Sequence, residues 1–131
     1  MNASSALAFL LLAAAPAAAA PEERIAPLVQ QPLTGVAGKQ FAAAVVIFPP
    51  GARALPHRHG TAFLYAYVLQ GTVRSQIAGQ PVRIYRTGEG WVEQPGVHHL
   101  LTENASQTAP ARLLVTFVSD KGAPLKIPDH R

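Results

Sequence analysis

The sequence predicts an all-β fold, an antiparallel sandwich or small β-barrel, and three observations support this. Twelve prolines and ten glycines in 131 residues supply many turns. Between these turns lie short apolar and β-branched runs, about ten residues apart, as in sandwiches and barrels. No segment keeps the 3.6-residue period of an amphipathic helix beyond about three turns. The length suits one domain, because domains typically hold about 100–150 residues.

The expected strands follow one another between turn residues. The segment 41–48 is apolar throughout and ends at Pro49, as expected of a strand that is buried on both faces. A hairpin turn at Gly79 separates two further strands. These two strands are 72–78 and 81–86, and the remaining strand candidates are short and apolar or β-branched: 62–69, 91–93, 97–102 and 111–119. We therefore expect a β-barrel over residues 41–119.

The segments on either side of the barrel are rich in proline. Residues 21–40 are interrupted by Pro21, Pro27 and Pro32, so we expect an extended N-terminal arm there. Such an arm could add a strand to a second copy of the chain, which favours a homodimer. Residues 120–131 contain two prolines and are expected to form a flexible C-terminal tail.

Residues 1–20 have the pattern of a signal peptide. The run 7–12 is strongly apolar, 13–20 is almost entirely alanine, and no charged side chain precedes Glu22. The apolar run is too short for a transmembrane helix, which needs about 20 residues. It fits the apolar region and small-residue cleavage zone of an export signal. We expect a periplasmic or secreted protein without a membrane span; the alternative is a retained N-terminal tail.

The composition excludes several classes of function. The chain has no cysteine, which excludes disulfides, thiolate metal sites and cysteine nucleophiles. The net charge of +4 comes from 11 basic and 7 acidic residues that are scattered along the chain. Without a basic run, nucleic acid is not an expected partner. A small molecule is the expected ligand.

Histidine is the residue type that points to chemistry. Four of the five histidines fall in two groups, His57 with His59 and His98 with His99. Side chains at i and i+2 of an extended segment share a face, and a histidine from another strand can converge on them. Each histidine alone is more often an ordinary polar residue. Together the two groups, framed by glycines, favour one divalent transition metal, for which Fe, Mn, Zn, Ni and Cu are all candidates.

The first histidine group lies within a spaced pattern. Gly51 is followed after five residues by His57, then by His59, and after four more residues by Leu64. Gly71 closes the pattern six residues later. This spacing resembles the first sequence motif of the cupin superfamily, whose glutamate position is held here by Leu64.

The second histidine group resembles the second cupin motif. Gly88 is followed after five residues by Gln94, where the family has proline, and Glu103 falls on the family's asparagine. His99, rather than His98, falls on the ligand position. The resemblance implies a small single-domain cupin of the type-2 kind, with a double-stranded β-helix or jelly-roll fold.

The resemblance implies that His57, His59 and His99 are the metal ligands. Leu64 cannot coordinate a metal, so three neutral imidazoles would leave its charge of +2 uncompensated. Such a site would favour anionic ligands and would strongly lower the pKa of a bound water. It also leaves coordination positions open for a substrate or dioxygen.

The expected surroundings of the site follow from strand alternation. Leu64, Ala66 and Val68 would line the pocket, while Tyr65 and Tyr67 would face away from it. His98, Glu93 and Glu103 could orient a ligand histidine, although a surface position is the more common state of such residues. The aromatic residues expected in the core are Phe48, Phe63 and Phe117, and Trp91 is expected in the core or at an interface.

Three functions remain open at this point. The first is an exported metal-binding cupin, with dioxygenase-type oxidation of a small organic substrate. The second is a non-catalytic module that binds a small ligand or a metal, such as a sensor. The third is a metal-independent isomerase or epimerase, which needs a histidine base beside an acid or a tyrosine. The fold alone does not choose among them, and no catalytic residue is assigned.

Overall fold

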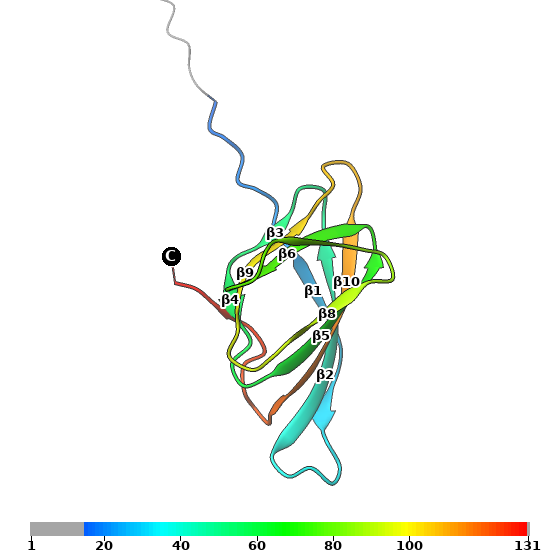
Figure 1. Ribbon diagram of the computed structural model, residues 1–131, viewed down its shortest axis with the longest axis vertical. Coiled ribbons are helices and arrows are strands. Elements are labelled where there is room, and N and C mark those ends of the chain that lie inside the picture. Colours follow the sequence, from blue (N-terminus) through cyan, green and yellow to red (C-terminus); the bar gives the residue numbers. More distant parts are fainter. Residues whose placement is uncertain (1–14, 131) are drawn as a thin grey trace, which may run out of the picture.

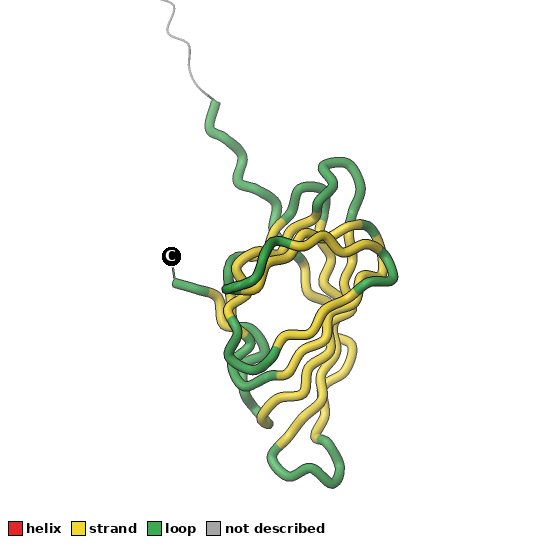
Figure 2. Tube along the Cα trace, in the orientation of Figure 1, coloured by secondary structure: helices red, strands yellow, loops and turns green. Residues whose placement is uncertain are grey.

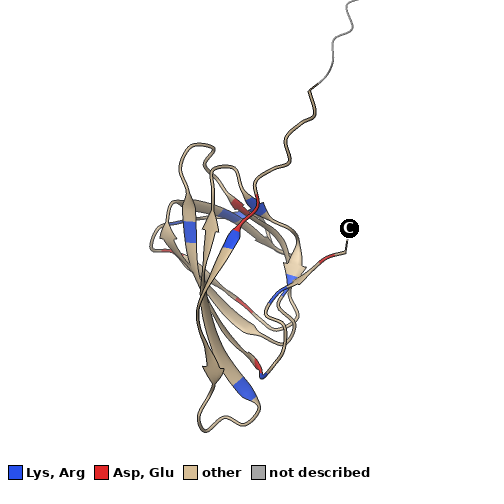
Figure 3. Ribbon diagram, turned by 180° about the vertical axis from the view of Figure 1, so that it is seen from behind, with Lys and Arg blue, Asp and Glu red and all other residues tan. Residues whose placement is uncertain are grey.

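The computed structural model describes residues 15–130. Most of the predicted signal peptide lies outside these residues. Within the described range the chain forms strands, turns and loops but no helix, and therefore no helix that could cross a membrane (Figure 2). Basic and acidic residues lie dispersed over the strands and loops (Figure 3).

The described chain contains eleven strands arranged in two antiparallel sheets, as expected of an all-β jelly roll (Figure 1). One sheet has the order β1-β2-β10-β5-β8, the other has the order β11-β4-β9-β6-β7, and β3 pairs with β9. The strand bounds are β1 Arg24–Pro32, β2 Lys39–Phe48, β3 Arg53–Ala54, β4 His57–Arg58, β5 Phe63–Gln70, β6 Thr72–Ile77, β7 Arg83–Arg86, β8 Gly90–Glu93, β9 His98–Asn104, β10 Ala111–Asp120 and β11 Ile127–Pro128.

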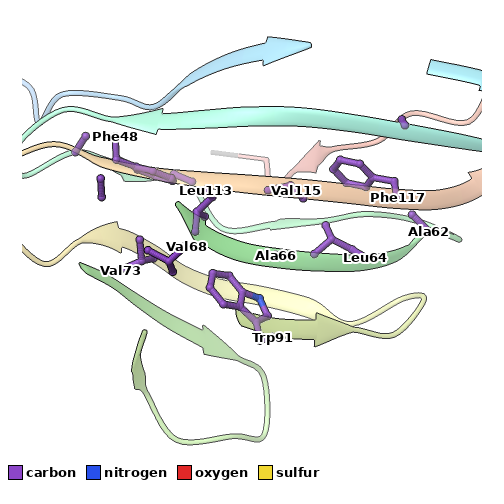
Figure 4. Packing of buried hydrophobic residues seen from close by; sticks show 14 residues of the cluster. Phe48, Ala62, Leu64, Ala66, Val68, Val73, Trp91, Leu113, Val115 and Phe117 are labelled. Carbon is purple, nitrogen blue, oxygen red and sulfur yellow. The ribbon is translucent and has the colours of Figure 1, made fainter. Parts of the chain in front are cut away.

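The hydrophobic core is built by alternation along the central strands. On β10 the side chains of Leu113, Val115 and Phe117 are buried, and the residues between them are more exposed. Figure 4 shows these residues in one cluster with Trp91. The expected core positions of Phe48, Trp91 and Phe117 are confirmed.

One core prediction is wrong, and alternation gives the reason. Phe63 is 39% exposed. On β5 the buried positions are Leu64, Ala66 and Val68, so Phe63 and Tyr65 point to the other face of the sheet. An aromatic side chain at the end of a strand is therefore placed by the period of its strand and not by its hydrophobicity.

Two strand pairings bring distant parts of the sequence to one place. On β4 and β9 His57 lies directly opposite His99. On β5 and β8 Leu64 lies directly opposite Glu93. Residues directly opposite in an antiparallel pair have neighbouring side chains on one face. These registers decide which side chains meet inside the barrel.

Gly90 allows β8 to approach β5 closely. A Cβ atom at this position would lie 2.4 Å from the carbonyl oxygen of Ala66 and 2.8 Å from the hydroxyl of Tyr65. The backbone oxygen cannot move aside, so only glycine fits. This approach places Trp91 and Glu93 against the interior.

The segments at both ends of the barrel also pair with it. Residues 24–32, within the expected arm, form β1, which pairs with β2 of the same chain and has an irregularity between Pro27 and Val29. Near the C-terminus, within the expected tail, β11 pairs with β4, so that Pro128 lies opposite His57. Both ends thus lie beside strands that shape the interior.

Candidate metal site

A cavity of about 350 Å³ lies between the two sheets. Most of its lining is apolar and includes Leu64, Ala66 and Phe117. Val68 shares the buried face of β5 but is not part of this lining. The polar groups at the cavity wall include three histidines and the carboxylates of Glu23 and Glu93, which is the combination of shape and chemistry expected of a small-molecule site.

The three histidines are His57, His59 and His99, and they converge at this cavity. One ring nitrogen from each lies within 4.8 Å of the others. The ring centroid of His57 lies 4.7 Å from that of His59 and 5.1 Å from that of His99. The convergence expected from the sequence spacing is therefore present, because the β4–β9 register brings the two groups together.

Backbone carbonyls fix the protons of two of these rings. His57 Nδ1 lies 2.7 Å from the carbonyl oxygen of Leu55, and His59 Nδ1 lies 2.5 Å from that of Leu125. A carbonyl oxygen only accepts, so each Nδ1 donates and carries the proton. Each Nε2 then keeps a free lone pair, which is the form of imidazole that binds a metal.

Burial keeps both rings neutral. Burial lowers the pKa of His57 to about 3, although the hydrogen bond to Leu55 opposes this shift. Burial also lowers the pKa of His59, against the opposing effects of its bond to Leu125 and of the charge on Glu93. In the low-dielectric interior a charged imidazolium is costly, and a neutral ring is favoured.

Both ring nitrogens of His99 have partners. Nδ1 lies 3.0 Å from Oε1 of Glu93, and Nε2 lies 2.8 Å from the hydroxyls of both Ser75 and Thr102. A carboxylate accepts, so Nδ1 donates to Glu93, and the single lone pair of Nε2 accepts from the hydroxyl of Ser75 or Thr102. The sequence did not indicate Ser75 and Thr102, because no local motif marks a hydroxyl that acts from a neighbouring strand position.

Glu93 is buried at the site, and the expectation of a surface position was wrong for it. Only 2% of the residue is exposed. Oε1 accepts a hydrogen bond of 2.9 Å from Nε1 of Trp91 as well as the bond from His99. Oε2 has no hydrogen-bond partner and lies 3.7 Å from Nε2 of His59. The signal was alternation: Trp91 was expected in the core, and Glu93 lies two residues further on the same face of β8.

The charge of Glu93 is stabilised by its neighbours. Burial raises the pKa of this carboxyl, but the hydrogen bond and the electrostatic attraction of the His99 N–H group, with the bond from Trp91, outweigh burial and hold the pKa below its ordinary value. The site therefore contains a buried, ionised carboxylate.

The other two residues suggested as orienting groups have partners outside the site. His98 Nε2 lies 2.7 Å from Oδ2 of Asp129, near the C-terminus. Glu103 forms an ion pair with Arg74. The register shift between Gln76 and Ile77, opposite β9, brings His99 and Thr102 to the same buried face. His98 and Glu103 each follow or precede one of these two residues directly and therefore face the other side of the sheet.

The residues present fit a divalent transition metal. His57 and His59 offer free Nε2 atoms, His99 is adjacent, and an unpartnered carboxylate oxygen lies within the same group. Buried polar atoms normally have partners, so an orphaned carboxylate oxygen beside bare imidazole nitrogens indicates a place for a cation.

Comparisons with known proteins agree with this arrangement. The sequence matches the family described as "Cupin domain" over residues 44–117. Among curated proteins, no sequence matches this chain significantly. Many solved structures, in contrast, resemble its fold.

Two similar structures show the fold. The cupin domain of Schizosaccharomyces pombe Cnp3 has a TM-score of 0.64 and 19% identity, over 80% of this chain and 66% of that chain. A conserved protein with a double-stranded β-helix domain from Klebsiella pneumoniae has a TM-score of 0.63 and 16% identity, over 83% of this chain and 86% of that chain.

Two enzymes are also similar in structure. Oxalate oxidase in complex with glycolate has a TM-score of 0.63 and 25% identity, over 78% of this chain and 53% of that chain. The DMSP lyase DddQ from Ruegeria pomeroyi has a TM-score of 0.59 and 25% identity, over 67% of this chain and 42% of that chain. The chain thus spans about half the length of these enzymes.

The family match covers more than half of the 131 residues and includes both histidine groups, β5 and most of β10. The two-sheet jelly roll and the structural likeness to a cupin domain agree with it. The chain belongs to the cupin family.

Proposed function

We propose that this cupin binds one divalent transition metal through His57, His59 and His99. The observation that supports the proposal most strongly is the pair of bare Nε2 atoms on His57 and His59, which backbone carbonyls hold in this form. A ring whose other nitrogen donates to a carbonyl is preset in tautomer and orientation for a metal.

We further propose an oxidation of dioxygenase type on a small, largely apolar organic substrate. A bound redox-active metal would supply a position for dioxygen and for the substrate. The apolar walls around Leu64 and Phe117 would exclude water and hold the carbon skeleton of the substrate. Lys126 also lines the cavity, where it pairs with Glu23, and would attract an anionic group. The structural likeness to oxalate oxidase supports the proposal of an oxidation. The apolar lining of the cavity supports the proposal of a largely apolar substrate.

The metal proposal is tested by elemental analysis of protein purified from cells grown without added metal. We expect about one equivalent of one transition metal per chain. In parallel, oxygen uptake is measured while small carboxylic acids and alcohols are added. Substrate-dependent uptake by the metal-loaded protein supports an oxidation. If the protein binds metal but takes up no oxygen with any substrate, it is a metal-binding module without this activity. If no metal is bound even after titration, the metal proposal is contradicted.

A second function is favoured by one specific contact. An isomerase or epimerase without a metal needs a histidine beside an acid, and the hydrogen bond between His99 and Glu93 provides such a pair at the cavity. Chelation distinguishes the two functions. Activity that survives complete metal removal belongs to the histidine–carboxylate pair, and activity that is lost and then restored by metal belongs to the metal site.

We also propose that the chain is exported. The apolar and alanine-rich pattern of residues 1–20 supports this proposal. Sequencing the N-terminus of the protein from its native host tests it. A mature protein that begins near residue 19 or 20 agrees with export, and an intact N-terminus on protein found inside the cell contradicts it.

A homodimer is the proposed assembly. β1 is an edge strand, and Ile25, Leu28 and Val29 on it are exposed apolar side chains. Pairing of two such edges would cover both the backbone groups and the apolar surface. We expect light scattering to give twice the mass of the chain at micromolar concentration, and Leu28→Asp to shift it toward the monomer. A monomeric wild-type protein would contradict this assembly.

A further inference from the structure

We infer that Glu93 is itself a ligand of the metal, so that its carboxylate enters the site from β8 opposite Leu64. The inference rests on the metal site proposed above and adds a fourth ligand to the three histidines. It changes the formal charge of the site from +2 to +1. The contacts around the two oxygens of this carboxylate support it.

The unpaired carboxylate oxygen of Glu93 is best satisfied by a positively charged partner. Oε2 is buried without a partner, 3.7 Å from Nε2 of His59. That nitrogen carries no proton, because Nδ1 donates to Leu125. Two lone pairs thus face each other with no hydrogen between them, which is unfavourable in a low-dielectric interior. A proton on Nε2 of His59 would satisfy that nitrogen and Oε2 but leave Nε2 of His57 bare, whereas a cation satisfies the oxygen and both Nε2 atoms.

The spacing of the carboxylate oxygens from the histidines also suits a common ion. Ligand atoms about 2.1 Å from one ion lie roughly 3.0–3.4 Å apart when they are neighbours in its coordination shell. Glu93 Oε1 lies 3.0 Å from Nδ1 of His99, and Oε2 lies 3.7 Å from Nε2 of His59. The first separation falls within this range, and the second exceeds it by about 0.3 Å, so a small movement of the carboxylate toward His59 gives the spacing of neighbouring ligands to both histidines.

The proton of His99 has an alternative position when a metal binds. If Nδ1 binds the metal, its proton is released and Nε2 becomes the protonated nitrogen. Nε2 then donates to the hydroxyl of Ser75 or Thr102, which both lie 2.8 Å away. Hydroxyls both donate and accept, so these two serve either tautomer. When the metal replaces the hydrogen bond between His99 and Glu93, both residues bind the ion instead. No buried polar atom of either residue is then left without a partner.

The strand register explains how the carboxylate reaches the site. Leu64 and Glu93 are direct cross-strand partners on β5 and β8, and both line the cavity. A carboxylate at either position would start from neighbouring backbone positions and point into the same space. Trp91 Nε1 holds the Glu93 carboxylate from the side, which fixes its orientation toward the histidines.

The test measures Co²⁺ binding and the visible spectrum of bound Co²⁺, which reports ligand number and type. The variants are Glu93→Gln, Glu93→Gln with Leu64→Glu, and Glu103→Gln as a matched control whose carboxylate pairs with Arg74 outside the site. Loss of a group that only orients a ligand costs about 10–100-fold in metal affinity. For Glu93→Gln we expect a loss above about 100-fold and a changed spectrum, with affinity regained when Leu64→Glu restores a carboxylate.

The outcomes separate this inference from the proposed function. If the wild-type protein binds Co²⁺ but Glu93→Gln binds it within about 100-fold and with the same spectrum, Glu93 is not a ligand and the three-histidine site stands. If the wild-type protein binds no Co²⁺, both proposals are overturned. Glu103→Gln should match the wild type in each measurement, and a comparable loss there would show a nonspecific charge effect and overturn the inference.

A measurement on the unmodified protein covers the case in which Glu93→Gln does not fold. Infrared difference spectra with and without Zn²⁺ report the carboxylate stretching bands. We expect one buried carboxylate to change its band splitting at one equivalent of Zn²⁺. Unchanged carboxylate bands at full Zn²⁺ occupancy would overturn the inference.

Discussion

Zn²⁺ is expected to stabilise the wild-type protein against urea by about 4 kcal/mol when free Zn²⁺ is about 1,000 times its dissociation constant. The reason is linkage: the three histidines converge only in the folded chain, so the ion binds the native state in preference to the unfolded one. The His57→Ala variant lacks one of the three predicted ligands, a ring that the carbonyl of Leu55 holds in the metal-binding tautomer. We expect the stabilisation by the same Zn²⁺ concentration to fall to near zero in this variant.

The matched control for this prediction is His98→Ala. His98 neighbours a predicted ligand in sequence but pairs with Asp129 on the other side of the sheet. Its removal should leave the Zn²⁺-induced shift of the urea midpoint intact. An equal shift in His57→Ala would place the bound ion elsewhere and contradict the site.

The second large effect is expected at Asn104, at the end of β9. Its side chain is buried, and Nδ2 lies within hydrogen-bond distance of the carbonyl oxygens of Phe48, Pro49 and Ala109. Its Oδ1 accepts a bond of 2.9 Å from the backbone nitrogen of Ser106. The amide thereby ties the end of β2 to the loop between β9 and β10.

Asn104→Ala should lower the free energy of unfolding by about 3–4 kcal/mol, because it removes the bonds to the Ala109 carbonyl and the Ser106 amide at about 1–3 kcal/mol each, while the Pro49 carbonyl keeps its bond from the Ala52 amide. Urea titration followed by circular dichroism measures this loss. Thr108→Ala, in the exposed part of the same loop, should change stability by less than about 0.5 kcal/mol. A loss below about 1 kcal/mol in Asn104→Ala would show that water replaces these bonds.

The fold and the three histidines were accessible from sequence because they depend on local spacing. Short apolar and β-branched runs between turn residues indicated the strands, and the interval between His57 and His59 placed both rings on one face. His99 was assigned by motif position rather than by geometry. The register that sets it opposite His57 is a property of two strands that lie about 40 residues apart in the chain.

The carboxylate at the site was the main residue misjudged. Glu93 was expected at the surface because charged side chains are rarely buried without partners. Its partners come from other positions: His59 and His99 converge on it through strand pairing, while Trp91 is two residues away on its own strand. The contact of His59 with Leu125 was inaccessible for the same reason, since 66 residues separate them.

The bond between Leu125 and His59 makes the chemistry of the interior depend on the last residues of the chain. A protease that cuts between Asp120 and Leu125 would leave the pairing of β2, β5 and β10 in place. It would, however, release the acceptor that fixes the proton on His59 Nδ1. A clipped preparation can therefore retain this sheet while no carbonyl holds the His59 ring in one tautomer.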